Sequence, residues 1–168
     1  IYKTWGAGTL NLQNNSIGSL STPSSISCSS AATGNNQSLV GIVTQATGTL
    51  VLEGHTVAYL RNQNTRNDAA SYVAGIQIGA TSTTTLNRNF VFGLSCASTG
   101  SANFVAALYT NFSSAEGSLK ATNNILSLGA QLTNPLYGVY GVYNLSNAPE
   151  TYYHNTISLT PTRTGSTL

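Results

Sequence analysis

The feature that most constrains this fold is a short phrase that recurs five times along the chain. Each copy starts with a polar residue, and its third position is Ile or Val. The first residues of the five copies, which lie 40, 34, 34 and 32 positions apart, are Asn15, His55, Asn89, Asn123 and Asn155. A repeat of this length is typical of solenoids, in which each period forms one coil that stacks on the next.

A second repeat keeps a constant phase with the first. Its small residues lie 34, 32 and 34 positions apart, inside segments rich in Val, Ile and Tyr, and they are Gly41, Gly75, Ala107 and Gly141. Such segments favour strands, and no window shows a sustained 3.6-residue period. The sequence therefore predicts an all-β fold, a single parallel β-helix over residues 1–168, with about four to five coils of roughly 34 residues and three strands per coil.

A sandwich of β-hairpins is the alternative all-β fold. Its hairpins would need tight two-residue turns, yet the chain contains neither Asn-Gly nor Asp-Gly. Parallel stacking of like phrases explains the repeat without such turns, so we favour the β-helix.

The polar first residue of each phrase is expected at a sharp bend. Asn tolerates the left-handed conformation, and stacked Asn amides can donate to and accept from the coils above and below. We therefore predict a structural ladder of Asn15, His55, Asn89, Asn123 and Asn155. The alternative role for His55 is a general acid/base pair with Glu53, but no nucleophile or second carboxylate recurs near it.

The bend, together with Tyr140-Gly-Val-Tyr-Asn144 and Tyr153-His-Asn-Thr-Ile157, resembles right-handed parallel β-helix repeats of the pectate-lyase-like type. The pattern is most similar to repeat regions of large secreted surface proteins, as in Bacteroidetes-like bacteria. This resemblance implies a right-handed solenoid, an extracellular or cell-surface location and a much longer parent chain. Because the sequence opens at Ile1-Tyr2, we expect a fragment or a processed piece.

Catalytic chemistry finds little support among the acidic residues. Hydrolases of polysaccharide need two carboxylates about 5 to 9.5 Å apart. The four acidic residues fall at unlike phases of the repeat, and they are Glu53, Asp68, Glu116 and Glu150. No cluster of them predicts a calcium site, so we expect no metal, no cofactor and no enzyme activity. Three arginines that could share a neighbourhood, and so bind an anion, are Arg61, Arg66 and Arg88.

The charge pattern excludes several partners. Only 6% of residues are charged and the net charge is +2, so no basic stripe for nucleic acid is present. The chain also lacks a long apolar segment, and we expect no membrane insertion. The two cysteines, Cys28 and Cys96, are expected about 9 to 10 Å apart in stacked coils, beyond the roughly 7 Å limit for a disulfide, and hence free.

The first strand of each coil is the candidate interface. With Ile42 and its equivalents facing inward, we predict that Val40, Ala74, Ala106 and Tyr140 also face inward. The predicted outward residues, a candidate interface, are Leu39, Gly41, Val43, Val73, Gly75, Gln77, Val105, Ala107, Tyr109, Val139, Gly141 and Tyr143. This apolar outer face predicts cover by a loop of the same chain, by another chain, or by a glycan stacked on tyrosines.

These observations favour an extracellular structural or adhesive surface element. A solenoid without caps exposes strand edges, and a nearly uncharged surface offers little repulsion between copies. We therefore expect self-association into a filament, sheath or stalk, with copies of the chain, neighbouring surface proteins and glycans as partners. The alternative is a carbohydrate-binding or polysaccharide-cleaving β-helix whose active coils lie outside this segment.

Overall fold

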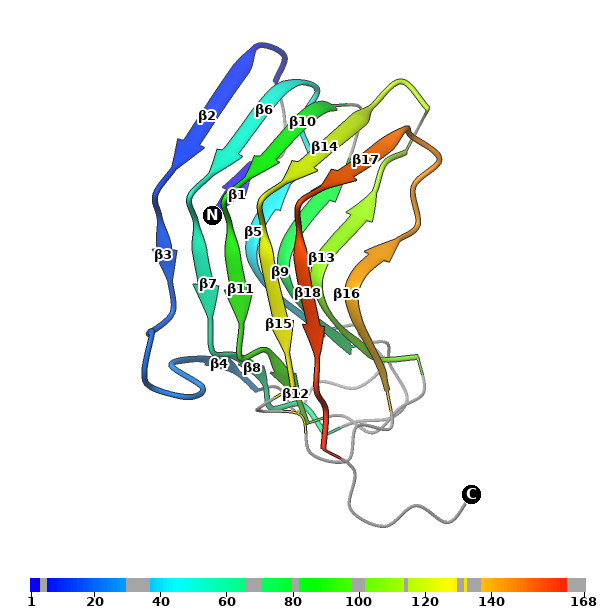
Figure 1. Cartoon of the computed structure of the whole chain (residues 1–168). Coiled ribbons are helices and arrows are strands. Elements are labelled where there is room, and N and C mark those ends of the chain that lie inside the picture. Colours follow the sequence, from blue (N-terminus) through cyan, green and yellow to red (C-terminus); the bar gives the residue numbers. More distant parts are fainter. Residues whose placement is uncertain are drawn as a thin grey trace.

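The protein is described by a computed structural model that covers residues 1–3, 6–29, 37–65, 71–79, 82–97, 102–113, 115–129, 132 and 137–162. Within these residues every regular element is a β-strand, and all paired strands are parallel (Figure 1). None of them forms a helix that could cross a membrane. The predicted all-β, parallel solenoid is therefore confirmed.

Four sheets run along the solenoid. Sheet A comprises β1 (Tyr2–Lys3), β5 (Gln37–Thr44), β9 (Ser71–Gly79), β13 (Phe104–Asn111) and β16 (Gly138–Asn144). Sheet B comprises β2 (Thr9–Gln13), β6 (Gly48–Glu53), β10 (Ser82–Asn87), β14 (Ser118–Thr122) and β17 (Glu150–Tyr153). Sheet C comprises β3 (Ser16–Ile17), β7 (Thr56–Ala58), β11 (Phe90–Phe92), β15 (Ile125–Leu128) and β18 (Thr156–Leu159). Sheet D comprises β4 (Ile26–Cys28), β8 (Leu60–Asn62) and β12 (Ser95–Cys96).

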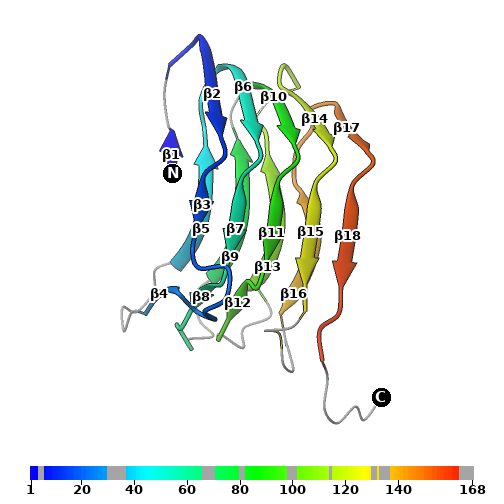
Figure 2. The same ribbon diagram turned by 60° about the vertical axis from the view of Figure 1, so that its left-hand side comes forward.

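The chain visits the sheets in the same order in each coil, and Figure 2 shows sheets B and C as two continuous ribbons of stacked strands. Residue 39 pairs with residue 73, and residue 73 with residue 105, so one coil takes 34 or 32 residues. Among the described residues, the three coils of β1–β4, β5–β8 and β9–β12 contribute a strand to all four sheets. The solenoid thus has about three complete turns, slightly fewer than the four to five coils predicted, and a fourth strand in these turns.

The interior of the solenoid is apolar. Side chains from sheets A, B and C fill it, with Ile42, Leu52 and Val57 fully buried in the second coil. Each interior position repeats along a column: Leu12, Leu52, Leu86, Ala121 and Tyr152 are successive partners in sheet B. Burying such columns against one another supplies the main stabilisation, about 25 cal/mol per Å² of apolar surface.

The alternation of inward and outward residues in sheet A breaks at its small-residue column, and the predicted facing of three columns is wrong for this reason. Gly41 and Ile42 both face the interior, because a Cβ on Gly41 would lie 2.5 Å from the side chain of Val57 while Ile42 is fully buried. The residues that precede the small residue in each strand therefore lie on the opposite face of the sheet from the one predicted. The first predicted interface column packs inward, as Leu39, Val73, Val105 and Val139, and the second also faces inward, as Gly41, Gly75, Ala107 and Gly141.

The swap sends the Val40 column outward. Ala74 and Ala106, predicted to face inward, instead belong to a second cluster on the outer face of sheet A. Tyr140 follows them in this column and is 37% exposed.

The cysteines share one column of sheet D. Asn62 pairs with Cys28 on one side and with Cys96 on the other, so two strand spacings separate the thiols. Neither cysteine forms a disulfide bond, as predicted.

Candidate functional site

A hydrogen-bonded ladder marks the bend between sheets B and C. The backbone N–H of Asn15 donates to His55 Nδ1 at 3.1 Å, and the N–H of His55 donates to Asn89 Oδ1 at 3.0 Å. The N–H of Asn89 donates to Asn124 Oδ1, and that of Asn124 to Asn155 Oδ1, both at 2.9 Å. Each coil thus donates a backbone proton to a side chain of the following coil.

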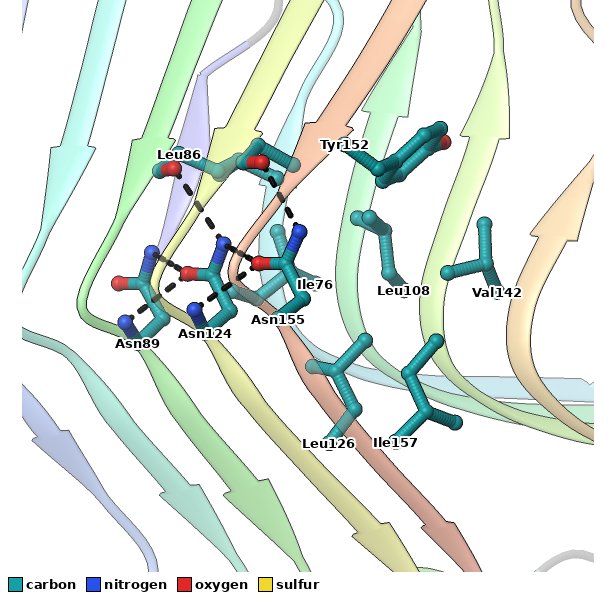
Figure 3. Close-up of a pocket in the computed structure, with 11 residues that line it drawn as sticks. Ile76, Leu86, Asn89, Leu108, Asn124, Leu126, Val142, Tyr152, Asn155 and Ile157 are labelled. Atoms are coloured by element: carbon teal, nitrogen blue, oxygen red, sulfur yellow. Dashed lines mark hydrogen bonds between the residues drawn. The ribbon is translucent and has the colours of Figure 1, made fainter.

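The side-chain amides of the ladder donate both to carbonyls of the preceding coil and to amide oxygens of the following coil. Figure 3 shows Asn124 Nδ2 reaching Leu86 O, at 3.3 Å, and Asn155 Oδ1, at 2.9 Å. Asn89 and Asn155 donate in the same way to carbonyls of the preceding coil. The ladder therefore fixes the register of neighbouring coils inside an apolar interior, where unmade hydrogen bonds are costly.

Two details of the predicted bend are wrong. The ladder residue of the fourth coil is Asn124, because Asn123 is exposed and bonds to Asn87 Oδ1 instead. The left-handed conformation belongs to the residue before each ladder position: φ lies between 53° and 68° at Asn14, Gly54, Arg88, Asn123 and His154. The bend and the ladder thus need two adjacent residues, one for the backbone turn and one for the hydrogen bonds.

His55 and Glu53 do not form an acid/base pair. His55 is fully buried and acts as a ladder residue, and burial lowers the pKa of its imidazole. Glu53 instead accepts hydrogen bonds from Asn87 at 2.8 Å and Arg88 at 2.7 Å. Both contacts lower the pKa of its carboxyl group, and the contact with Asn87 has the larger effect. Both residues therefore have structural roles.

The outer face of sheet A carries an aromatic cluster, which we define as Tyr72, Phe104, Tyr109, Tyr140 and Tyr143. Tyr72 stacks on Phe104 with centroids 4.7 Å apart, and Tyr140 stacks on Tyr143 at 4.5 Å. These rings cover Ala74 and Ala106, which are fully buried on the outer side of the sheet. The sheet is thus apolar on both faces.

One predicted interface column does lie on this outer face. Tyr109 and Tyr143 belong to the aromatic cluster, and Gln77 Oε1 accepts a hydrogen bond from the Tyr72 hydroxyl at 3.1 Å. Val43 pairs with Gln77 in the same column and is half-buried. The stacking of Tyr72 on Phe104 was not predicted, because both residues directly precede the repeated segments that start at Val73 and Val105.

The interior opens at the C-terminal coil. A cavity of about 210 Å³ lies between the ladder and sheet A, and its lining is almost wholly apolar. Figure 3 shows Leu108 and Val142 on one side of it, Leu126 and Ile157 below, and Tyr152 above. Ile157 is 51% exposed, whereas its partner Leu126 in the preceding coil is 4% exposed. The cavity therefore lies at the end of the core that no further described coil covers.

A carboxylate stands beside this opening. Glu150 follows Leu119 in an interior column of sheet B. Its Oε2 accepts hydrogen bonds from Asn144 Nδ2, at 3.0 Å, and from the Tyr152 hydroxyl, while its Oε1 is buried and has no donor among the described residues. Burial, followed by the contact with Glu150, raises the pKa of Tyr152, so its phenol remains a donor at neutral pH. No sequence pattern predicted this arrangement, because it depends on the register between neighbouring coils.

The remaining candidates for catalysis are scattered. Glu116 is exposed on the loop before β14, and Arg61 is exposed on sheet D. Asp68 and Arg66 lie outside the described residues. Among the residues that the structure covers, no three His, Cys, Asp or Glu side chains come together as metal ligands.

Comparison of the chain with protein-family models, with curated proteins and with solved structures found no match.

Proposed function

We propose that this chain is an extracellular structural element, a β-solenoid that self-associates end to end into a filament, sheath or adhesive stalk. The extracellular location follows from the resemblance of the repeats to secreted surface proteins. The association is supported by the exposed apolar residues and edge strands of the outermost described coils.

The C-terminal opening is the observation that carries this proposal. Tyr152, Ile157 and Leu159 leave between 39% and 51% of their surface exposed at the last coil. The strands β16, β17 and β18 each lie at the edge of their sheet, with unpaired backbone groups on the outer side. An apolar core end framed by three free edges is suited to receiving another coil.

The first coil presents the matching edges. The strands β1, β2 and β3 are the opposite edge strands of the same three sheets. Ile1, Tyr2 and Leu20 are 45%, 69% and 64% exposed there. The two outermost described coils thus offer the kind of surface that neighbouring coils bury between them.

Sedimentation velocity over a range of protein concentrations, with electron microscopy of the same samples, tests this proposal. We expect the mean mass to rise with concentration beyond that of a dimer and filaments to appear. A chain that remains monomeric at all concentrations would overturn the proposal.

The aromatic cluster favours a second function, the binding of a neutral glycan. Tyr140 and Tyr143 form a stacked pair next to Tyr109, and no described charged side chain belongs to the cluster. Flat rings with polar tips suit a ligand that has both C–H faces and hydroxyl groups. Titration with neutral oligosaccharides should show binding that Tyr140→Ala abolishes and Tyr153→Ala, at an exposed tyrosine outside the cluster, preserves. Equal binding by both variants would contradict this function.

A further inference from the structure

We propose that Asn14 and Asn123 are latent deamidation sites, and that the ladder protects them by holding the backbone N–H of the residue that follows each of them. The contacts that carry this proposal join neighbouring coils of one chain. The modification sites therefore exist whether or not the chain self-associates.

Two of the five bend residues carry a side-chain amide. The left-handed bend, with φ between 53° and 68°, is formed by Asn14, Gly54, Arg88, Asn123 and His154. Asparagine suits this conformation because its short polar side chain tolerates it. Asparagine is also a chemically labile residue. Asn14 and Asn123 are both exposed, so water reaches their side chains.

Deamidation of an asparagine starts at the backbone nitrogen of the next residue. This nitrogen loses its proton and attacks Cγ of the asparagine, so that a new C–N bond closes a succinimide ring while the Cγ–Nδ2 bond breaks and ammonia leaves. Water then opens the ring to aspartate or isoaspartate. The attack requires the peptide unit after the asparagine to turn towards its side chain. A hydrogen bond from the attacking N–H opposes both the turn and the loss of the proton.

The contact between Asn15 and His55 protects Asn14. The nitrogen that would attack Asn14 is that of Asn15, and its N–H donates to His55 Nδ1 at 3.1 Å. The N–H of Asn14 itself donates to Glu53 O at 2.9 Å. The peptide units on both sides of Asn14 are thus bonded to the following coil, and neither can turn unless the two coils separate locally.

The contact between Asn124 and Asn155 protects Asn123 in the same way. The N–H of Asn124 donates to Asn155 Oδ1 at 2.9 Å, and the N–H of Asn123 donates to Tyr153 O at 3.2 Å. The side chain of Asn123 has a restraint of its own, because its Nδ2 donates to Asn87 Oδ1 at 3.1 Å. The same arrangement therefore protects both bend asparagines.

The asparagines inside the ladder are protected by burial as well. Asn89 and Asn124 are 2% and 4% exposed. The N–H of Phe90, which follows Asn89, donates to His55 O at 2.8 Å, and the N–H of Ile125 donates to Asn89 O at the same distance. The two bend asparagines differ from these in being open to water, so the hydrogen bond of the following residue is their main protection.

Modification at the bend would disturb the ladder beside it. Isoaspartate places one additional carbon atom in the main chain, directly before the ladder residue. At Asn14 this residue is Asn15, and at Asn123 it is Asn124. The additional atom moves the ladder N–H away from its acceptor in the following coil. The ladder thus prevents a reaction whose product would break it.

Two substitutions at one position test the protection of Asn123. Asn155→Ala removes the acceptor of the Asn124 N–H and should raise the rate of deamidation at Asn123 by about threefold to tenfold, the factor that corresponds to one lost hydrogen bond. Asn155→Asp keeps the acceptor oxygen and should leave this rate near that of the unmodified protein. Both variants lose the side-chain donor to Ala121 O, so they form a matched pair. Mass spectrometry of proteolytic peptides, after prolonged incubation in mildly alkaline buffer, measures the rates.

His55→Ala and His55→Asn form the equivalent pair for Asn14. His55→Ala should raise the rate at Asn14 and leave Asn123 unchanged, whereas Asn155→Ala should do the reverse. His55→Asn supplies an amide acceptor and should preserve the protection. This selectivity distinguishes the loss of one contact from general unfolding, which exposes both sites, and thermal melting checks that each variant folds.

Three results would overturn the proposal. The first is deamidation at Asn123 that is no faster in Asn155→Ala than in Asn155→Asp. The second is an equal rise at both sites in each alanine variant. The third needs no variant: the unmodified chain should deamidate at Asn14 and Asn123 faster in urea than when folded, and equal rates would show that the fold protects neither site.

Discussion

His55 Nδ1 accepts the backbone N–H of Asn15 at 3.1 Å, so an imidazole takes the place that an Asn amide oxygen fills in the following coils. This contact requires Nδ1 to be unprotonated. The ring is fully buried, and burial lowers its pKa from the usual 6.5. The ladder therefore holds a neutral histidine.

Acid should destabilise the fold through His55. The unfolded chain takes up a proton on this ring as the pH falls below 6.5, whereas the folded chain takes it up only at lower pH. The stabilising contribution is thus complete above pH 6.5 and is lost as the pH falls towards the folded-state pKa. Urea unfolding at several pH values should show this loss.

His55→Asn should remove this part of the pH dependence, because the variant has no titrating ring in the ladder. It should keep the ladder intact, because Asn occupies the equivalent position in the three following coils. His154→Asn is the matched control, since His154 is exposed. Equal pH dependence in the unmodified protein and in His55→Asn would contradict the role of the buried ring.

A substitution at the ladder residue Asn124 should destabilise the fold more than one at the neighbouring bend residue Asn123. Asn124 makes side-chain hydrogen bonds to Asn89, Leu86 and Asn155, and it is buried. Asn124→Ala should lower the free energy of unfolding by about 2–4 kcal/mol, because it leaves buried groups without partners. Chemical denaturation would measure this change.

The neighbouring Asn123 provides the control. Its φ of 57° suits glycine, and its side chain is exposed. Asn123→Gly should therefore change the free energy of unfolding by less than about 1 kcal/mol. A larger loss at Asn123 than at Asn124 would show that the ladder position is assigned wrongly.

The cysteines should differ in reactivity. Cys28 is half-buried, and burial raises the pKa of its thiol, while Cys96 is 7% exposed. A thiol reagent should label Cys28 slowly at neutral pH and faster at higher pH, and should reach Cys96 only when the protein unfolds. Cys28→Ser should abolish the labelling of the folded protein. Labelling of both thiols at the same rate would contradict the placement of Cys96.

Repeat spacing was sufficient to predict the parallel solenoid, because like residues stack only when coils have similar length. It was not sufficient to predict which face each residue of sheet A presents. The strict alternation assumed for Leu39 and Val40 fails because Gly41 and Ile42 both face inward. Only the backbone reveals such an irregularity. The position of Asn124 in the ladder likewise depends on which of two adjacent Asn residues makes the turn.

The residue of sheet C that packs against each small residue of sheet A follows a pattern that is visible in the sequence. Gly41, Gly75 and Gly141 pack against three β-branched residues, which are Val57, Val91 and Ile157. A Cβ at each glycine would lie 2.5 Å or less from the side chain that it faces. In the coil between, Ala107 replaces glycine, and the residue paired with Val91 in that coil is Leu126. Leucine has no methyl group on Cβ and so leaves room for the alanine. The choice of side chain in sheet C thus follows the choice in sheet A.

This relationship predicts a rescue at Gly75. A Cβ at this position would lie 2.3 Å from Val91 Cγ1 and 2.7 Å from Ala107 O, so Gly75→Ala should cost about 2–4 kcal/mol of unfolding free energy. Val91→Leu removes the methyl group that clashes and should recover part of this loss when the two are combined. The contact with Ala107 O limits the recovery.

A double-mutant cycle gives the measurement. Val91→Leu alone should cost less than about 1.5 kcal/mol, because it conserves hydrophobic character. The combined variant should then be more stable than the sum of the single effects predicts, with a coupling of about 1 kcal/mol or more. Strict additivity would mean that the clash at Gly75 is with the backbone alone, and that the pairing of glycine with β-branched residues has no energetic basis.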